Sequence, residues 1–108
     1  MKNPHSYLES DLKIAALAKA LAHPARLQII RFLYEKQSCF CGDIVKEIDL
    51  AQATVSQHLK ELKKQGIIQG QISGSAVCYC INPQSWEEMK TLFRTFLDHD
   101  LANESNCC

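Results

Sequence analysis

The chain has 108 residues, and its 12 basic and 12 acidic side chains give a formal net charge of zero. This length fits one small domain, and the balanced charge gives no global electrostatic argument for binding nucleic acid. No apolar run is long enough to span a bilayer, and residues 1–4 do not begin a signal peptide. We therefore expect a cytoplasmic protein without a membrane partner, in which the six cysteines are thiols, ligands or redox sensors rather than structural disulfides.

In chain order, residues 1–7 are expected to form a flexible arm before one domain at residues 8–100. The spacing of leucine and alanine predicts a first helix over residues 7–21. Pro24 suits the first turn of a second helix, which is expected to run to about residue 36. The inward side chains of this second helix are expected to be Leu27, Ile30, Leu33 and Tyr34. Residues 37–42 are then expected to be an extended or turn segment.

Residues 43–66 predict a helix-turn-helix. Asp43 is the expected N-cap of a short helix that ends near Ile48, and a tight connection leads into a second helix. The second helix has an apolar stripe for the core, formed by Val55, Leu59 and Leu62. Gly66 is placed just past its end, where a left-handed conformation costs glycine little. The opposite face begins with short polar side chains, which suit base edges, and continues with lysines, which suit phosphates.

Residues 67–72 and 76–81, joined by a turn containing Gly74, predict a β-hairpin directly after that helix, in the position of the wing of a winged helix. Alternation within the second strand predicts that Val77, Tyr79 and Ile81 face the core, whereas Cys78 and Cys80 share the outer face.

Asn82 and Pro83 predict the start of a final helix that runs to about residue 100. Its apolar set is too large for the last helix of so small a domain: Trp86, Met89, Leu92, Phe93, Phe96 and Leu97. We therefore expect the first and last helices to form a dimer interface, although both could instead complete the core of a monomer. Residues 101–108 are expected to be a mobile tail that ends in Cys107 and Cys108.

Four stretches resemble the ArsR/SmtB family of metal-responsive winged-helix repressors: Leu-Ala-His-Pro-Ala-Arg-Leu at 21–27, Cys-Phe-Cys at 39–41, Gln-Ala-Thr-Val-Ser-Gln-His-Leu at 52–59 and Val-Cys-Tyr-Cys-Ile at 77–81. The similarity runs from about residue 12 to about residue 98. It implies a mainly α winged helix-turn-helix with about five helices and one hairpin. It also implies a homodimeric repressor, not an enzyme, that binds palindromic double-stranded operator DNA and releases it when an inducer binds.

By position, the resemblance assigns the groove-facing residues to Gln52, Thr54, Ser56, Gln57 and His58, and the wing tip to Ser73, Gly74 and Ser75. Lys60 and Lys63 lie further along the same helix and are expected to contact phosphates. An enzymatic function is not expected, because no nucleophile–base pair or phosphate-binding loop is present.

Cys39 and Cys41 are the candidate sensor. In an extended segment these two thiols fall on the same side and can converge on one soft ion. They resemble the Cys-x-Cys of the arsenic-responsive branch, so arsenite or antimonite ranks first as inducer, and no constitutive cofactor is expected. A soft divalent ion of the cadmium/lead type ranks second. Zinc ranks third, because the last helix keeps His99 but lacks the other zinc-type ligands.

Trivalent arsenic prefers three thiolates, and Val45 occupies the position of the third cysteine in the arsenic branch. Cys78 and Cys80 are expected to be inert strand residues, although two thiols on one face could also form a redox or second metal site. Strand register prevents them from moving to a distant site. The tail from residue 101 can extend about 20 Å, so Cys107 or Cys108 is expected to complete the site. An alternative function on the same scaffold is a redox or persulfide sensor, in which cysteine oxidation releases the DNA.

Overall fold

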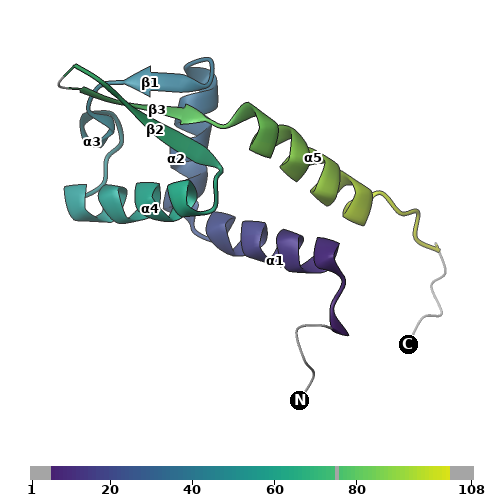
Figure 1. The fold of residues 1–108 in the computed structure, drawn as a ribbon. Coiled ribbons are helices and arrows are strands. Elements are labelled where there is room, and N and C mark those ends of the chain that lie inside the picture. Colours follow the sequence, from purple (N-terminus) through teal and green to yellow (C-terminus); the bar gives the residue numbers. More distant parts are fainter. Residues whose placement is uncertain (1–5, 75, 103–108) are drawn as a thin grey trace.

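The structure is a computed structural model that describes residues 6–74 and 76–102. This part of the chain forms the helices α1 (Glu9–Leu21), α2 (Pro24–Glu35), α3 (Ile44–Glu47), α4 (Gln52–Lys64) and α5 (Pro83–Leu97). It also forms the strands β1 (Cys39–Cys41), β2 (Ile68–Ser73) and β3 (Ala76–Ile81). As Figure 1 shows, α3 and α4 lie below a small sheet in which β2 and β3 form the hairpin. This arrangement confirms the predicted winged helix-turn-helix.

Side-chain caps fix the starts of three helices. His23, Asp43 and Asn82 each accept a hydrogen bond from the backbone N–H two residues further on, at 3.0–3.1 Å. Such caps satisfy backbone donors that have no partner within the helix. At the other end of α4, Gly66 has a φ of +76°, in the left-handed region that costs glycine little. The predicted caps at Asp43 and Asn82, and the predicted stop at Gly66, are therefore confirmed.

The core lies between α2, α4 and the sheet. Val55, Leu59 and Leu62 of α4 are buried there, as predicted. On α2 the predicted inward set was partly wrong, because Leu27 and Tyr34 are 44% and 49% exposed. The buried face of α2 instead carries Ala25, Ile29, Ile30 and Leu33. The spacing of Ala25, Ile29 and Leu33 is four residues, which keeps them on one face of the helix.

The sheet contains a strand that the predicted hairpin lacked. Its strand order is β1-β3-β2, with both pairs antiparallel, so β3 is the central strand. Phe40 of β1 is opposite Tyr79 of β3, and both rings pack against the core. The cysteines on either side of these two residues therefore lie on the other face of the sheet. The expectation that Cys78 and Cys80 share the face turned away from the core agrees with this register.

α1 and α5 extend from the same side of the winged-helix body (Figure 1). Several of their large apolar side chains are exposed, with exposed fractions of 46% for Leu12, 58% for Phe96 and 71% for Leu97. The molecule measures 58 × 33 × 25 Å along its principal axes, which is elongated for a chain of this length. None of the described helices is both long and apolar enough to cross a membrane.

Candidate functional site

The outer surface of α4 carries most of the side chains that were expected to contact DNA. Six of the seven expected on this helix are exposed: Gln52, Thr54, Ser56, Gln57, Lys60 and Lys63. The Gln57 amide donates to Glu61 Oε1 at 3.4 Å, an exposed contact that can exchange for another partner. Lys63 and Lys64 lie in the last turn, where the partial negative charge of the helix end favours cations. The helix therefore presents short polar side chains at its start and ammonium groups at its end.

His58 is the exception, and the expectation that it faces a DNA groove is wrong. Its side chain is 7% exposed, because position 58 lies beside Val55, Leu59 and Leu62 on the buried face of α4. Its Nδ1 accepts a hydrogen bond of 3.0 Å from Arg26 Nε. The His23 ring lies with its centroid 4.4 Å from that of His58. His58 is therefore an internal polar contact between α4 and α2.

Arg26 connects three helices through the same guanidinium group. Besides its bond to His58, it donates from one terminal nitrogen to the backbone carbonyls of Lys19 and Ala20, at 3.3 and 3.2 Å. Burial lowers the pKa of His58 below its ordinary value, and the nearby His23 and Arg26 charges lower it further. The resulting neutral imidazole keeps Nδ1 free of a proton, so that it can accept from Arg26.

The wing tip is described in part. Gly74 follows β2 and has a φ of +64°, which suits a tight turn between the two strands. Ser73 is the last residue of β2. Ser75, the third expected wing-tip residue, lies outside the described residues, as do Cys107 and Cys108.

Four cysteines meet on the face of the sheet that is turned away from the core. Cys39 is directly opposite Cys80, and Cys41 is directly opposite Cys78, with Cα atoms 4.0 Å apart in both pairs. Each pair is joined by a disulfide bond. Cys78 and Cys80 are 7% and 9% exposed, whereas the two cysteines of β1 are exposed. The register extends each pair onto β2, where Gln69 lies opposite Cys80 and Gln71 lies opposite Cys78.

A strained turn places β1 against β3. Gln37 and Ser38 both have positive φ values, 61° and 85°, which cost a non-glycine residue about 1–2 kcal/mol each. The Ser38 N–H donates to Leu33 O at 2.9 Å, and its carbonyl accepts from the Ile81 N–H at 2.7 Å. These bonds fix the first residue of β1 beside the end of β3. The turn thus offsets its conformational cost through backbone hydrogen bonds that position Cys39.

The exclusion of Cys78 and Cys80 from the Cys39–Cys41 site is wrong, because β1 pairs with β3. Their register does hold them in place, but the place is directly opposite Cys39 and Cys41. No signal in a three-residue stretch could identify its partner strand about 40 residues away; the matching Cys-x-Cys spacing in 39–41 and 78–80 was the one available indication. Whether Cys107 or Cys108 also contributes stays a prediction.

In the oxidised form, these sulfur atoms are bonded to one another. Among the described residues, no group of three or more His, Cys, Asp or Glu side chains is arranged to hold a metal ion. Reduction would convert the two disulfides into four thiols, and thiolates are the donors that soft ions prefer. The donor set therefore fits a thiophilic ion once it is reduced.

Comparison with known proteins agrees with the fold. Residues 23–69 match the family model described as "Bacterial regulatory protein, arsR family". The transcriptional repressor PagR of Bacillus anthracis is 36% identical over 75 residues, which cover 69% of this chain and 72% of PagR. The chain belongs to the arsR family. This confirms the predicted family and a regulator rather than an enzyme, whereas the arsenic branch stays a prediction.

Two further proteins illustrate the range of similarity. The repressor SmtB of Mycobacterium tuberculosis is 43% identical over 63 residues, covering 58% of this chain but only 46% of SmtB. The chain thus spans about half the length of that relative. The structure of reduced HlyU from Vibrio cholerae superposes with a TM-score of 0.65 at 25% identity, covering 84% of this chain and 95% of HlyU.

The lowered pKa of His58 predicts a pH-dependent stability. The unfolded chain binds a proton to this imidazole below about pH 6.5, whereas the folded chain resists it, so stability should fall as the pH drops below that value. One proton contributes no more than about 1.4 kcal/mol per pH unit. Urea unfolding should show that the free energy of unfolding falls more between pH 7.5 and pH 5.5 for the natural chain than for His58→Gln.

The variant His99→Gln is the matched control, since this imidazole is exposed near the end of α5. It should lose as much stability at pH 5.5 as the natural chain does. Equal losses in the natural chain and in His58→Gln would contradict the assignment.

Proposed function

We propose that the chain is a DNA-binding transcriptional repressor that binds a palindromic duplex operator as a homodimer. We further propose that arsenite or antimonite releases the operator by binding thiolates of the reduced four-cysteine cluster, formed by Cys39, Cys41, Cys78 and Cys80. One observation carries this proposal: the cluster joins β1, which leads into the helix-turn-helix, to β3, which is a strand of the wing.

The exposed face of α4 supports the DNA-binding part of the proposal. A helix of this size fits the major groove, where Gln52, Ser56 and Gln57 would have donors and acceptors for base edges. Lys60 and Lys63 would contact phosphates, and the turn at Gly74 would place the wing tip near the adjacent backbone. Because the chain has no net charge, binding depends on these local cations rather than on a global field.

The apolar surfaces of α1 and α5 support the homodimer. A cavity of about 740 Å³ lies between these helices, and its lining includes Leu8, Ile14, Leu92 and Phe96. Apolar surface of this kind is unfavourable in water and is typical of a protein–protein interface. A second copy of α1 and α5 would cover it and would give the two-fold symmetry that a palindromic operator requires.

The cluster supports a thiophilic inducer because it supplies more than two thiols. Cys39 and Cys41 alone would leave trivalent arsenic one ligand short, but Cys80 and Cys78 lie directly across from them. A third thiolate is thus available without the tail. Gly42 and Asp43 are the only residues between β1 and α3, so a change in the position of β1 passes directly to the helix-turn-helix. A coupling of about 1–3 kcal/mol between ion and operator would be typical.

The DNA-binding surface predicts a strong salt dependence. If the dimer neutralises roughly six phosphates, the slope of log K against log salt should be near −5. Lys63→Ala should weaken binding to all sequences about equally, whereas Ser56→Ala or Gln57→Ala should reduce the preference for the operator. Fluorescence anisotropy over a range of salt concentrations measures both effects. Operator binding that is insensitive to salt would contradict the assignment of this face.

The cluster predicts which cysteines respond to arsenite. In protein kept reduced with a phosphine, changing both Cys39 and Cys41 to Ser leaves two thiols in the cluster, so it should leave operator affinity unchanged but abolish release by arsenite. X-ray absorption should count three sulfur neighbours of the bound arsenic. Deleting residues 107–108 should keep that count at three, whereas changing both Cys78 and Cys80 to Ser should lower it. If the deletion lowers the count and the double substitution does not, the tail supplies the third thiolate.

A second candidate function is a redox sensor, because the two disulfides show that the four sulfurs are close enough to bond in pairs. In this function, oxidation itself would release the operator, without any ion. We expect operator affinity to fall when the reduced protein is treated with diamide and to recover with a phosphine. Peptide mapping should locate the bonds at Cys39–Cys80 and Cys41–Cys78. Unchanged affinity in fully oxidised protein would exclude this function and leave the ion-responsive one standing.

A further inference from the structure

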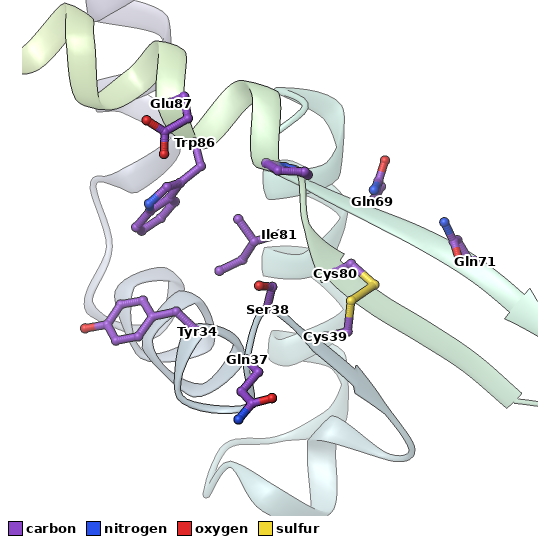
Figure 2. Close-up of a pocket in the computed structure, with 11 residues that line it drawn as sticks. Tyr34, Gln37, Ser38, Cys39, Gln69, Gln71, Cys80, Ile81, Trp86 and Glu87 are labelled. Carbon is purple, nitrogen blue, oxygen red and sulfur yellow. A yellow bond between two sulfur atoms is a disulfide. The ribbon is translucent and has the colours of Figure 1, made fainter.

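A cavity of about 560 Å³ opens beside one of the two disulfides (Figure 2). The rings of Tyr34 and Trp86, whose centroids are 6.1 Å apart, lie on one side of it, and the Cys39–Cys80 disulfide lies on the other. The walls thus come from the end of α2, the start of α5 and the face of the sheet that carries the cysteines. A cavity of this size is in the range of sites for small molecules.

The cavity distinguishes two otherwise equivalent rows of side chains. The register aligns Cys39, Cys80 and Gln69 in one row across the sheet, and Cys41, Cys78 and Gln71 in the next. Among the described residues, the lining of the cavity includes the first disulfide but neither cysteine of the second. The two rows therefore differ in what covers them, not in their own chemistry.

The lining indicates what kind of molecule would fit. Side-chain amides from Gln37, Gln69 and Gln71 provide both donors and acceptors. Among the described lining residues, Glu87 is the one with a charged acidic or basic side chain, so the cavity favours a positive group over a negative one. Glu87 also contacts Lys90 at 3.4 Å, but this pair is exposed, and such pairs exchange at little cost.

We propose that this cavity binds a small thiol carrying an ammonium group, and that the bound thiol reduces the Cys39–Cys80 disulfide in preference to Cys41–Cys78. The ammonium group contacts Glu87, the polar atoms contact the glutamine amides, and the sulfur faces the disulfide. Cys39 is the sulfur attacked, because it is exposed whereas Cys80 is 9% exposed.

The reaction balances with two thiols. The thiolate of the first attacks Cys39 Sγ, the bond to Cys80 breaks, and Cys80 leaves as a thiolate that takes a proton from water. A mixed disulfide now joins the small thiol to Cys39. A second thiol attacks the small-molecule sulfur, releasing a small-molecule disulfide and the Cys39 thiolate. Two electrons pass from the two small thiols to the protein.

This inference does not depend on the inducer or on DNA binding, since it concerns how one pair of the cluster is returned to the thiol form. Its test therefore uses neither arsenite nor an operator, and its failure would leave the proposed function untouched.

The experiment compares two proteins that each retain one of the two disulfides seen among the described residues: Cys41→Ser with Cys78→Ser, and Cys39→Ser with Cys80→Ser. This avoids exchange between the pairs. Each is oxidised and then treated with cysteamine or with thioglycolate, small thiols of opposite charge, and the rate of reduction is followed by maleimide labelling. The ratio of the two proteins' rates cancels the intrinsic reactivity of each thiol. The ratio is the rate for Cys39–Cys80 divided by the rate for Cys41–Cys78. We expect it to be about fivefold higher with cysteamine than with thioglycolate, which corresponds to ~1 kcal/mol from the contact with Glu87.

Surface variants provide matched controls. Glu87→Gln should lower the cysteamine ratio toward the thioglycolate value, whereas Glu88→Gln, which removes another exposed carboxylate with its own lysine partner, should not. Tyr34→Ser should lower the ratio, whereas Tyr7→Ser should not, although the two tyrosines are similarly exposed at 49% and 54%.

In the natural chain, rapid acid trapping followed by peptide mapping should find the cysteamine adduct on Cys39. Equal ratios for the two thiols, or adducts distributed evenly between Cys39 and Cys41, would overturn the proposal.

Discussion

The antiparallel pairing of β1 with β3 is the constraint on which the candidate site depends. β1 has three residues, too few to be stable alone, and it is held by ladder bonds to β3 and by the 2.7 Å bond from the Ile81 N–H to Ser38 O. This pairing places Phe40 and Tyr79 toward the core. The same alternation places four sulfur atoms together on the other face. Without β1, the chain would contain two separated Cys-x-Cys pairs; with it, the pairs form one cluster.

A second constraint holds α4 against the rest of the domain. Arg26 bonds to the Lys19 and Ala20 carbonyls at the end of α1 and to His58 within α4. The neutral imidazole is required for this contact, because a protonated Nδ1 could not accept from a guanidinium. The apolar stripe of α4 fixes which face is buried. The Arg26–His58 hydrogen bond has a preferred geometry, whereas apolar contacts are non-directional. Together they leave the polar face of α4 toward solvent, where DNA would have to approach.

The sequence correctly predicted the features that depend on residues close together in the chain. The N-caps at Asp43 and Asn82, the stop at Gly66 and the stripe at Val55, Leu59 and Leu62 all depend on residues within a few positions of one another. His58 was misassigned because a histidine on the flank of an amphipathic helix can face either way, and its partner Arg26 is 32 residues distant. The sulfur cluster was missed for a similar reason. A three-residue strand carries almost no periodic signal, and its pairing is a long-range contact that the turn at Gln37 and Ser38 makes possible.

The position of the cluster relates its chemistry to the DNA-binding surface. On one side, β1 continues through Gly42 and Asp43 into α3, and α3 leads into α4. On the other side, β3 and β2 form the wing. A bond between sulfur atoms, or an ion shared by them, would therefore change the connection between two elements that, under the proposed function, contact one DNA duplex together. Since the sheet register already holds the cysteines in opposite pairs, such a change does not require the chain to refold. The four sulfur atoms differ in accessibility: Cys39 and Cys41 are exposed, whereas Cys78 and Cys80, directly opposite them on β3, are buried. Under the proposed function, an inducer that needs three thiolates would bind the exposed thiols of β1 first and then a thiol of β3 opposite them, next to the strained turn and the start of the helix-turn-helix.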